Sequence, residues 1–552
     1  MKDFYLKPKL FSVLKGYEKG QLIKDLLAGI IVAIIALPLS IALALASGVE
    51  PACGVYTAVA AGFVVSFFGG SRVQIAGPTA AFATIVAGIV ATHGMDGLFV
   101  ATILAGIMLI LMGVFKFGGL IKYIPYTITT GFTAGIAVTI LLGQVKDFFG
   151  LQYAAGVRPV ELLEKMHANI EAIGTFSWQA LLVGAVSLLI LIVYPKFEKR
   201  VPPSLIAVVV GALMVAFIPG LGDGVYTIGE LYTIPSGLPQ VNFAGMDFSI
   251  AKITAVFPDA VTIAVLAAIE SLLSCVVADS MVSSRHNSNA ELTAQGLGNI
   301  ASVLFGGIPA TGAIARTAAN VKNGGRTPIA GMVHAVILLL VLLFLMPYAG
   351  LIPMPTIAAI LFVVAYNMSE WRKFVRTCKT APKSDIAVMV VTFVLTVLFD
   401  LVVAIEVGMI MAALLFLKRM SDQTEVTSWK YIEQENDEES IELCEVPKHV
   451  RVYEISGPLF FGAADKMLDI TFKEYTKVLV LRMRAVSALD ATAMNAIEEL
   501  YDRCEKAGLK VVFSHVNEQP MKVMTKAGFV ERVGEEFFCP RIDVALKKAA
   551  QL

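Results

Sequence analysis

Two ionisable residues, Arg316 and Glu270, interrupt long apolar stretches of this sequence. Arg316 lies within GGIPATGAIARTAANVKNGGRTPIAG (306–331), and Glu270 lies within DAVTIAVLAAIESLLSCVVADS (259–280). A charge in an apolar environment is costly and normally marks a functional position. The fixed positive charge predicts an anion ligand, and the carboxyl group can hold a coupling proton or help to coordinate a cation. The alternative is a structural ion pair between the two residues, and both roles can coexist.

Glycine and proline surround Arg316 and recur in a second stretch, AGPTA at 76–80. A short apolar segment follows each stretch, at 311–320 and at 79–92, and ten helical residues span about 15 Å, half of a bilayer core. Two half-helices that begin at the same depth with opposite polarity bring their N-termini face to face. Free N–H groups and the helix dipole favour an anion there. The alternative is that Gly and Pro only kink two packed spans.

Neighbouring residues complete the predicted anion site. The first amides of the second half-helix run from Gly312 to Ala315, where small side chains let a ligand approach the backbone. Ser274 lies one helical turn after Glu270, on the same face. Pro38 interrupts the first apolar span near Leu39, Ser40 and Leu43, although most apolar residues there are expected to serve packing.

Composition places these motifs in a membrane protein. The chain has 552 residues, 57% of them hydrophobic, with a mean hydropathy of +0.75, which is typical of proteins with many membrane spans. Twelve segments have the length of a span, and the two half-spans raise the predicted number of crossings to fourteen. The twelve segments are 23–46, 51–68, 97–115, 121–142, 178–195, 202–218, 255–277, 291–307, 328–347, 350–366, 384–400 and 402–418.

The distribution of basic residues predicts the orientation. With both termini cytoplasmic, only five of the 27 Lys and Arg residues before residue 420 lie outside the N-terminal segment and the inner loops. The positive-inside rule therefore supports an inner-membrane protein with cytoplasmic ends. The two short segments are each the third of seven segments in their half of the chain. Such paired interrupted helices predict a substrate site between two halves that are inverted relative to each other. The chain has no CxxC and no His-rich spacing, which argues against a zinc site, and no phosphate loop, which argues against ATP-driven pumping. We expect no cofactor, no metal site, no nucleic-acid partner and no enzymatic activity.

The chain divides into four predicted regions: an N-terminal cytosolic segment (1–22), a membrane domain (23–419), a polar linker (420–447) and a cytosolic α/β domain (448–552). In the last, VRVYEI, KVLVLRM and LKVVFSHV read as strands, and ATAMNAIEELYDRCEKAG reads as an amphipathic helix. The fold class is thus an α-helical membrane protein followed by a small α/β domain.

These motifs together resemble the SulP family, the bacterial relatives of the solute carrier 26 anion transporters. The resemblance rests on ALPLSIALALASGVEPACGVY, on GPT, on IESLLSCVVADSMVSSRHNSNAELTAQGLGNI and on GGIPATGAIARTAANVKNGGRTP, and the tail looks like a STAS domain. It implies core and gate subdomains, a homodimer and an elevator movement. Matched by motif, the family site falls on Leu39, Leu43, Thr79, Ala80, Glu270, Ser274 and residues 313–316 of this sequence.

Several residues of this chain differ from the family pattern, and some of these differences concern which ion is coupled to transport. Some sodium-driven bicarbonate members have Asp and Thr where Glu270 and Ser274 stand here, and Thr where Ile314 stands. A glutamate at the first position resembles members thought to be proton-coupled, so we expect proton symport, with sodium as the weaker alternative. In prestin a serine precedes the matching arginine, where this chain has Ala315. The site then offers mostly backbone donors and selects no single anion.

The tail raises a regulatory question. Thr492, in LDATA (489–493), matches the position of a phosphorylatable serine in related anti-sigma antagonists, although an ordinary threonine at a helix start is the favoured interpretation. A cytosolic regulator is a partner that the STAS resemblance implies. Three functions stay open: a proton-coupled anion transporter, an uncoupled anion exchanger or channel, and a membrane-anchored anion sensor that signals through the tail.

Overall fold

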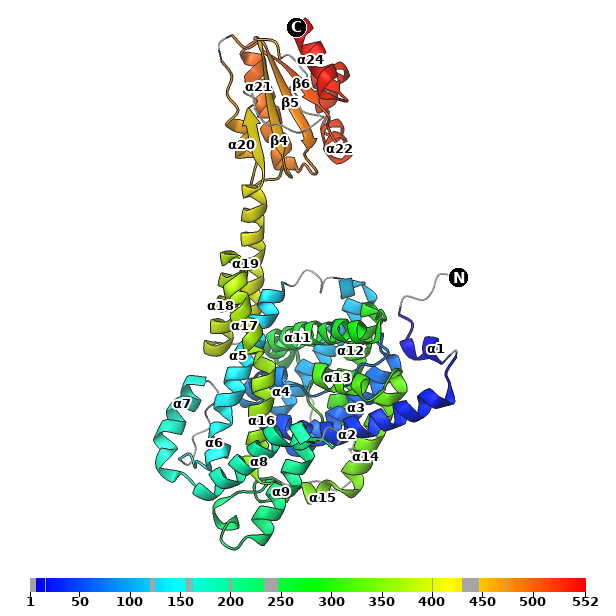
Figure 1. The fold of residues 1–552 in the computed structure, drawn as a ribbon, viewed down its shortest axis with the longest axis vertical. Coiled ribbons are helices and arrows are strands. Elements are labelled where there is room, and N and C mark those ends of the chain that lie inside the picture. The colour runs from blue at the N-terminus through cyan, green and yellow to red at the C-terminus, as the bar shows by residue number, and fades with distance from the viewer. Residues whose placement is uncertain are drawn as a thin grey trace. The chain divides into compact units, whose positions relative to one another are not determined.

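The computed structural model describes residues 6–552, apart from 15, 120–124, 155–158, 160–161, 198–200, 233–246, 400, 429–445 and 474. These residues form two compact units, Met1–Met409 and Ile410–Leu552. Figure 1 shows a helical first unit and an α/β second unit. Most of the predicted linker, residues 429–445, lies outside the described residues.

The first unit is built from apolar helices. Each of the fourteen apolar segments predicted from the sequence coincides with a helix, and α4 contains two of them. The helices are α2 (Lys19–Ala46), α3 (Pro51–Phe68), α4 (Ala80–Val114), α5 (Tyr126–Gly143), α8 (Trp178–Phe197), α9 (Pro203–Phe217), α11 (Ile250–Val282), α12 (Ser288–Leu304), α13 (Ile314–Lys322), α14 (Pro328–Phe344), α16 (Met354–Ser369), α18 (Lys383–Leu398) and α19 (Leu401–Asp422), and the part of α19 from Ile410 onward belongs to the second unit. Shorter helices are α1 (Lys9–Val13), α6 (Val145–Phe149), α7 (Leu162–Glu171), α10 (Ile228–Leu231), α15 (Met346–Ala349) and α17 (Trp371–Thr380).

Length and hydropathy identify the membrane-spanning helices. Among the described residues, six helical stretches are at least 18 residues long and apolar enough to cross a bilayer. They are α2, α3, α4, α5 with α6, α8 and α11, and α9 and α14 are shorter apolar helices. Proline in the first turn starts α3, α9 and α14, where its missing N–H would have no partner in any case. The unit is therefore a multi-pass membrane domain, and the number of crossings stays a prediction.

Helix α4 is two helices joined by a break. Gly94, at φ 71° and ψ −178°, has a backbone conformation that a helix cannot contain. The segment from Ala80 to the break is thus a half-length helix, as the sequence predicts for 79–92. Glycine tolerates this conformation because it has no Cβ atom.

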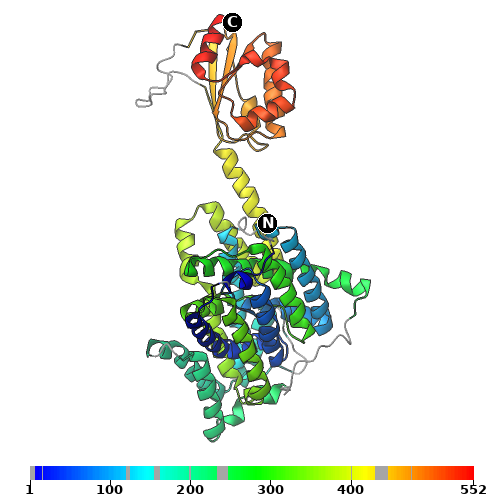
Figure 2. The same cartoon turned by 90° about the vertical axis from the view of Figure 1, so that its right-hand side faces the viewer.

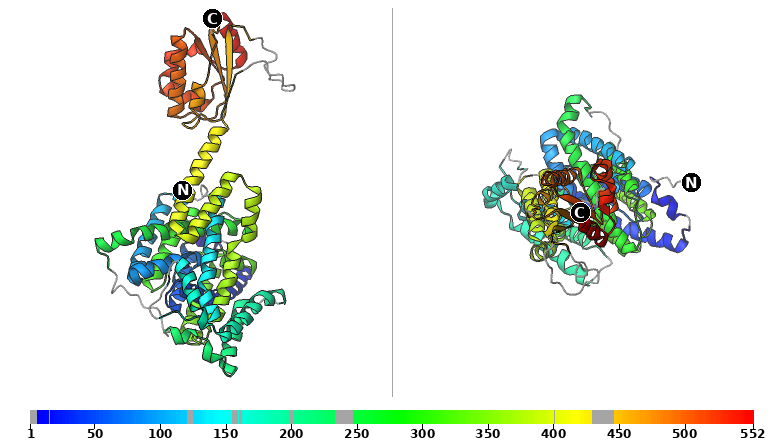
Figure 3. Two further views of the ribbon diagram at one scale, coloured as in Figure 1. Left: turned by 90° about the vertical axis from the view of Figure 1, so that its left-hand side faces the viewer. Right: turned by 90° about the horizontal axis from the view of Figure 1, so that it is seen from above.

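The helices pack in two groups. In the first group, α12 packs on α3 and α4, α11 on α4, α13 on α11, and α14 on α2 and α3. In the second, α16 and α18 pack on α5, while α8 packs on α9 and α16. Figure 3 shows the bundle from two further directions. Contacts of α2 with α9 and α16 connect the two groups.

The second unit contains a five-stranded sheet in the order β3-β4-β5-β6-β7. Strands β4 (Val450–Ser456), β5 (Val478–Ala485), β6 (Lys510–Ser514) and β7 (Phe538–Cys539) are parallel, and β3 (Glu425–Ser428) pairs antiparallel with β4. Helix α21 (Ala491–Lys506) packs on one face and α24 (Ile542–Gln551) on the other, as Figure 2 shows. The three predicted strands and the helix are confirmed, and β3 lies within residues expected to be linker.

Candidate functional site

Two short strands pair within the first helix group, one against α3 and the other against α11, and we call this pair the strand crossing. Strand β1 (Ala76–Gly77) pairs antiparallel with β2 (Thr311–Gly312), with Ala76 opposite Gly312 and Gly77 opposite Thr311. Helix α4 begins directly after β1, and α13 begins directly after β2. Because the strands are antiparallel, the two helices leave the crossing in opposite directions. Both helix N-termini therefore lie at one place, as the glycine–proline stretches predict.

Neither N-terminus is capped by a side chain. Thr79 precedes α4 and Ala313 precedes α13, and neither makes a side-chain capping hydrogen bond. The first N–H groups of a helix have no partner within the helix, and the helix dipole adds positive charge there. Ile314 is 44% exposed, and Ala315 is also exposed, whereas Ala313 is buried. Two of the four amides predicted to be free, Gly312 N and Ala313 N, instead donate to Ser271 Oγ (3.0 Å) and to the carbonyl oxygen of Ile75 (2.8 Å), because β2 packs on α11 and β1. The backbone donors at the start of α13 are therefore those that follow Ala313, beside two exposed side chains.

Arg316 adds a fixed positive charge to the crossing. Its side chain is 1% exposed, and its Nη2 atom donates to Ser40 Oγ (3.3 Å) and to the carbonyl oxygen of Pro78 (3.2 Å). Within the described residues, its Nε and Nη1 atoms have no hydrogen-bond partner. A buried charge with unpaired donors is unfavourable unless another group satisfies them. An anion supplies both the opposite charge and the missing acceptors.

Gly77 makes room for this guanidinium. A Cβ atom on Gly77 would lie 2.3 Å from Arg316 Nη1, closer than side-chain carbons approach such an atom. The glycine of the GPT motif therefore has a steric role beyond its place in the extended strand.

Glu270 of α11 lies at the same crossing but contacts different residues. Its Oε2 atom accepts from Thr79 Oγ1 and from Thr311 Oγ1, both at 2.9 Å. No basic group lies within ion-pair distance of the carboxylate in the part of the chain that the structure describes. The alternative of a Glu270–Arg316 ion pair is therefore wrong. The carboxyl group instead contacts Thr79 and Thr311, which precede helices α4 and α13.

Ser274 has a different environment from the one its spacing suggests. It lies one turn after Glu270, but its hydroxyl donates to Gln74 Oε1 at 2.8 Å and is buried. Gln74 in turn donates to the carbonyl of Ser271 (3.1 Å), and Ser271 Oγ accepts from Gly312 N (3.0 Å). These bonds attach α11 to both strands. Ser274 thus supports the crossing rather than facing the carboxylate.

The two leucines of α2 differ in exposure. Leu43 is 2% exposed, whereas Leu39 is partly buried and packs in a cluster with Ala358 and Ala359 of α16. Leu39 therefore lies where the two helix groups meet. Ala80, at the start of α4, is 8% exposed.

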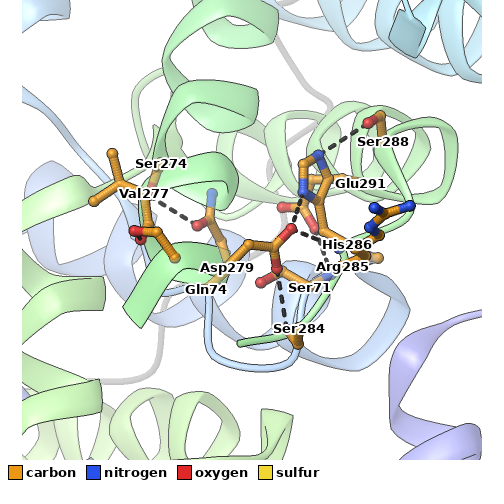
Figure 4. A network of polar contacts seen from close by, with 12 residues as sticks. Ser71, Gln74, Ser274, Val277, Asp279, Ser284, Arg285, His286, Ser288 and Glu291 are labelled. Carbon is orange, nitrogen blue, oxygen red and sulfur yellow. Dashed lines mark hydrogen bonds and ion pairs between the residues drawn. The ribbon is translucent and has the colours of Figure 1, made fainter. Parts of the chain in front are cut away.

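Buried polar side chains hold the chain before β1. Glu291 of α12 is fully buried, and its Oε2 atom accepts from Gly70 N (2.9 Å) and Ser71 N (3.1 Å). Figure 4 shows this carboxylate beside the pair of Asp279 and His286, whose contact atoms are 2.7 Å apart. The loop between α11 and α12 is thereby fixed against the segment that leads into β1.

A second cluster holds the far end of α13. Asp25 of α2 is fully buried and accepts from Tyr17 Oη (2.9 Å), Gln21 Nε2 (3.0 Å), Arg326 N (2.8 Å) and Thr327 Oγ1 (2.6 Å). The segment before α2 is thereby attached to the loop between α13 and α14.

Sequence reasoning missed several residues of the crossing. Gln74 and Thr311 have polar side chains beside the two predicted half-helices, and this position could have indicated a role. His334 of α14 is fully buried, and within the described residues neither ring nitrogen has a partner. The sequence feature that could have drawn attention to His334 is that it is a single histidine within an apolar span.

Thr492 belongs to the second unit. It is exposed at the second position of α21, directly after Asp490, the N-cap, and Ala491. Asp490 accepts from Ala493 N (2.8 Å) and from Phe461 N (2.9 Å). The hydroxyl at 492 is therefore accessible, as phosphorylation would require.

Comparison with known proteins decides the family. Residues 22–392 match the Sulfate permease family, and residues 443–545 match the STAS domain. The chain belongs to the sulfate permease (SulP) family. It is an anion transporter of this family with a C-terminal STAS domain, and it is not an enzyme, as the motifs indicate.

Curated relatives agree with membership of the SulP family, and a solved structure shares the fold. The chain is 41% identical to the Bacillus subtilis (strain 168) protein named "Putative sulfate transporter YvdB", over 95% of this chain and 97% of that one. It is 32% identical to the bicarbonate transporter BicA of Picosynechococcus sp., over 87% of each chain. The inward-facing structure of the murine Slc26a9 anion transporter has the same fold, with a TM-score of 0.89 at 18% identity, over 100% of this chain and 94% of that one.

Proposed function

We propose that this SulP protein is a secondary active transporter that couples uptake of a small anion to protons. The observation that carries the proposal is Arg316, a buried guanidinium with two nitrogen atoms unpaired within the described chain, beside two uncapped helix N-termini. The anion lies at Thr79, Ala80 and residues 312–316, with Leu39 and Leu43 nearby. Sulfate, bicarbonate and dicarboxylates fit the proposal, because backbone donors recognise charge rather than one anion shape.

Glu270 is the coupling residue in this proposal. Its carboxyl group contacts Thr79 and Thr311, which precede the two helices of the anion site. Protonation therefore removes a negative charge from the immediate neighbourhood of the anion, which favours anion and proton binding together. Ser274 acts through Gln74, because its hydroxyl is bonded there.

The two helix groups suggest how the anion crosses. The first helix group, α2, α3, α4, α11, α12, α13 and α14, carries the whole crossing and acts as the core, whereas α5, α8, α9, α16 and α18 act as the gate. We propose that the core moves against the gate as an elevator in a homodimer of inverted seven-segment repeats. Residues 23–419 then form the transport domain, in the inner membrane, with both termini cytoplasmic.

Uptake into proteoliposomes tests the proposal. We expect labelled sulfate, bicarbonate or fumarate to accumulate only with an inward proton gradient, and Glu270→Gln to abolish accumulation while anion binding persists. Exposed Glu50, replaced by Gln, is the control. Equal uptake with and without the gradient, unchanged by Glu270→Gln, would instead make the protein an exchanger or channel.

Sodium-coupled bicarbonate transport is the second candidate. The identity to a protein named as a bicarbonate transporter favours it, whereas the residues at 270, 274 and 314 depart from the sodium-driven pattern. Within the described residues, no group of three or more His, Cys, Asp or Glu side chains could hold a metal ion. Accumulation that follows a sodium gradient in the absence of a proton gradient would support this candidate.

A further inference from the structure

Helix α17 differs in character from the helices that flank it. Its sequence, WRKFVRTCKT, contains four basic residues and no acidic one, and none of its residues is buried. Helices α16 and α18, before and after it, are apolar. Figure 3 shows the yellow-green α17–α18 region beside cyan α5. A polar, basic helix between two apolar helices is expected at a membrane–water boundary.

Helix α17 has a basic face and an apolar face next to each other. Arg372, Arg376 and Lys379 are spaced by four and three residues, so they form one basic stripe. Trp371 and Val375 form the adjacent stripe and are 47% and 41% exposed. A basic stripe beside an exposed apolar stripe is the pattern of a helix that lies in the headgroup region of a bilayer.

The inner face attaches α17 to the protein. Phe374 packs against Phe393 of α18, with ring centroids 5.5 Å apart. Lys373 pairs with Glu370 at 2.8 Å and lies over the ring of Tyr126 at the start of α5. These contacts fix the orientation of the helix and therefore the direction of the basic stripe.

Two of the basic side chains remain available for a ligand. Arg376 and Lys379 are exposed and form no ion pair with any described residue. Exposed aromatic side chains surround this end of the bundle, with Tyr366 at 57% and Tyr126 at 48%. Trp and Tyr are enriched at the level of lipid headgroups, where their rings contact both apolar and polar groups.

We propose that α17 binds the headgroups of anionic phospholipids, with Arg376 and Lys379 on the phosphates and with Trp371 and Val375 at the acyl boundary. Charge complementarity favours this occupant, because the stripe is basic throughout and lies on a helix between two apolar helices of the membrane domain. The inference does not depend on which anion is transported or on the coupling ion.

Lipid retention by the full chain tests this site. Protein reconstituted in phosphatidylcholine, alone or mixed with phosphatidylglycerol, is extracted gently, and bound lipid is measured by native mass spectrometry. We expect the wild type to retain phosphatidylglycerol preferentially, and Arg376→Gln with Lys379→Gln to reduce its apparent affinity roughly tenfold. Exposed Lys506 and Lys510 of the second unit, both replaced by Gln, are the matched control and should change nothing.

Three results would overturn the proposal. They are unchanged phosphatidylglycerol retention in the double variant, an equal loss in the control variant, and equal competition by free inorganic phosphate, which would indicate an ion site instead. Unchanged retention together with altered transport in pure phosphatidylcholine would point to an acidic segment of the chain as the occupant. Because retention is measured without transport, a failure of the proposed function leaves this test intact.

Discussion

Glu270 and Arg316 lie at the same strand crossing, yet they do not pair. The carboxylate accepts from Thr79 and Thr311, whereas the guanidinium donates to Ser40 and to the Pro78 carbonyl. Each charge is thus held by neutral groups, and neither neutralises the other. A crossing arranged in this way can bind an anion at the guanidinium and a proton at the carboxylate as separate events.

Arg316→Gln should weaken anion binding strongly. The substitution removes the charge and the two nitrogen atoms that have no acceptor among the described residues. A hydrogen bond to a charged group contributes about 1.5–3 kcal/mol, which corresponds to roughly tenfold to a hundredfold in Kd. Anion-dependent thermal stabilisation of the purified protein measures the effect. Lys322→Gln, an exposed change at the other end of α13, serves as the control. Wild-type affinity in Arg316→Gln would remove the arginine from the site.

Gly77→Ala should reduce anion affinity although no charged residue is replaced. The new methyl group would lie 2.3 Å from Arg316 Nη1, so the guanidinium must move. Gly88→Ala, on the first half of α4, is the matched control because nothing lies within 4 Å of its added Cβ. We expect Gly88→Ala to be neutral or slightly stabilising, since alanine favours a helix by about 1 kcal/mol over glycine. Anion affinity is measured by titration, and an equal Kd for the two variants would contradict the steric role of Gly77.

Asp25→Leu should destabilise the membrane unit. The carboxylate is fully buried and accepts from four donors, and all four hydrogen bonds would be lost. The loss is expected to be about 3 kcal/mol or more. The apparent unfolding temperature in detergent measures it, with exposed Asp96→Asn as the control. An unfolding temperature equal to that of the wild type would show that the cluster contributes little.

Alkaline pH should release the segment that precedes α2. Burial, and then the hydrogen bond to Asp25, raises the pKa of Tyr17 from 10.0 to about 12. The folded state therefore favours the neutral phenol, so its stabilising contribution is complete below pH 10 and is lost as pH rises from about 10 to about 12. Limited proteolysis before Lys19 across this range should show increasing cleavage. Tyr17→Phe should lack this pH-dependent step, and the same step in that variant would assign it to another group.

Local sequence patterns predicted much of this protein. Hydrophobic length located the fourteen helical segments, and the glycine–proline stretches located the two strands that cross. The partners of the charged residues could not be predicted in this way. Thr79 and Glu270 are 191 positions apart, and Gln74 and Ser274 are 200 apart. Such contacts depend on how helices pack, which periodicity within one helix does not encode. Strand β3 was missed because three of its four residues, EVTS, are polar and none of the four is fully buried.

The closeness of the two strands also limits how the selectivity of this transporter can be redesigned. A Cβ atom on Gly312 would lie 1.6 Å from Gln74 Nε2, and Ala313 is buried. Ile314 and Ala315 are the neighbouring positions whose side chains are exposed. A library intended to exchange one oxyanion for another should therefore vary residues 314 and 315 and keep the glycines unchanged, since larger residues there would separate the strands that create the site.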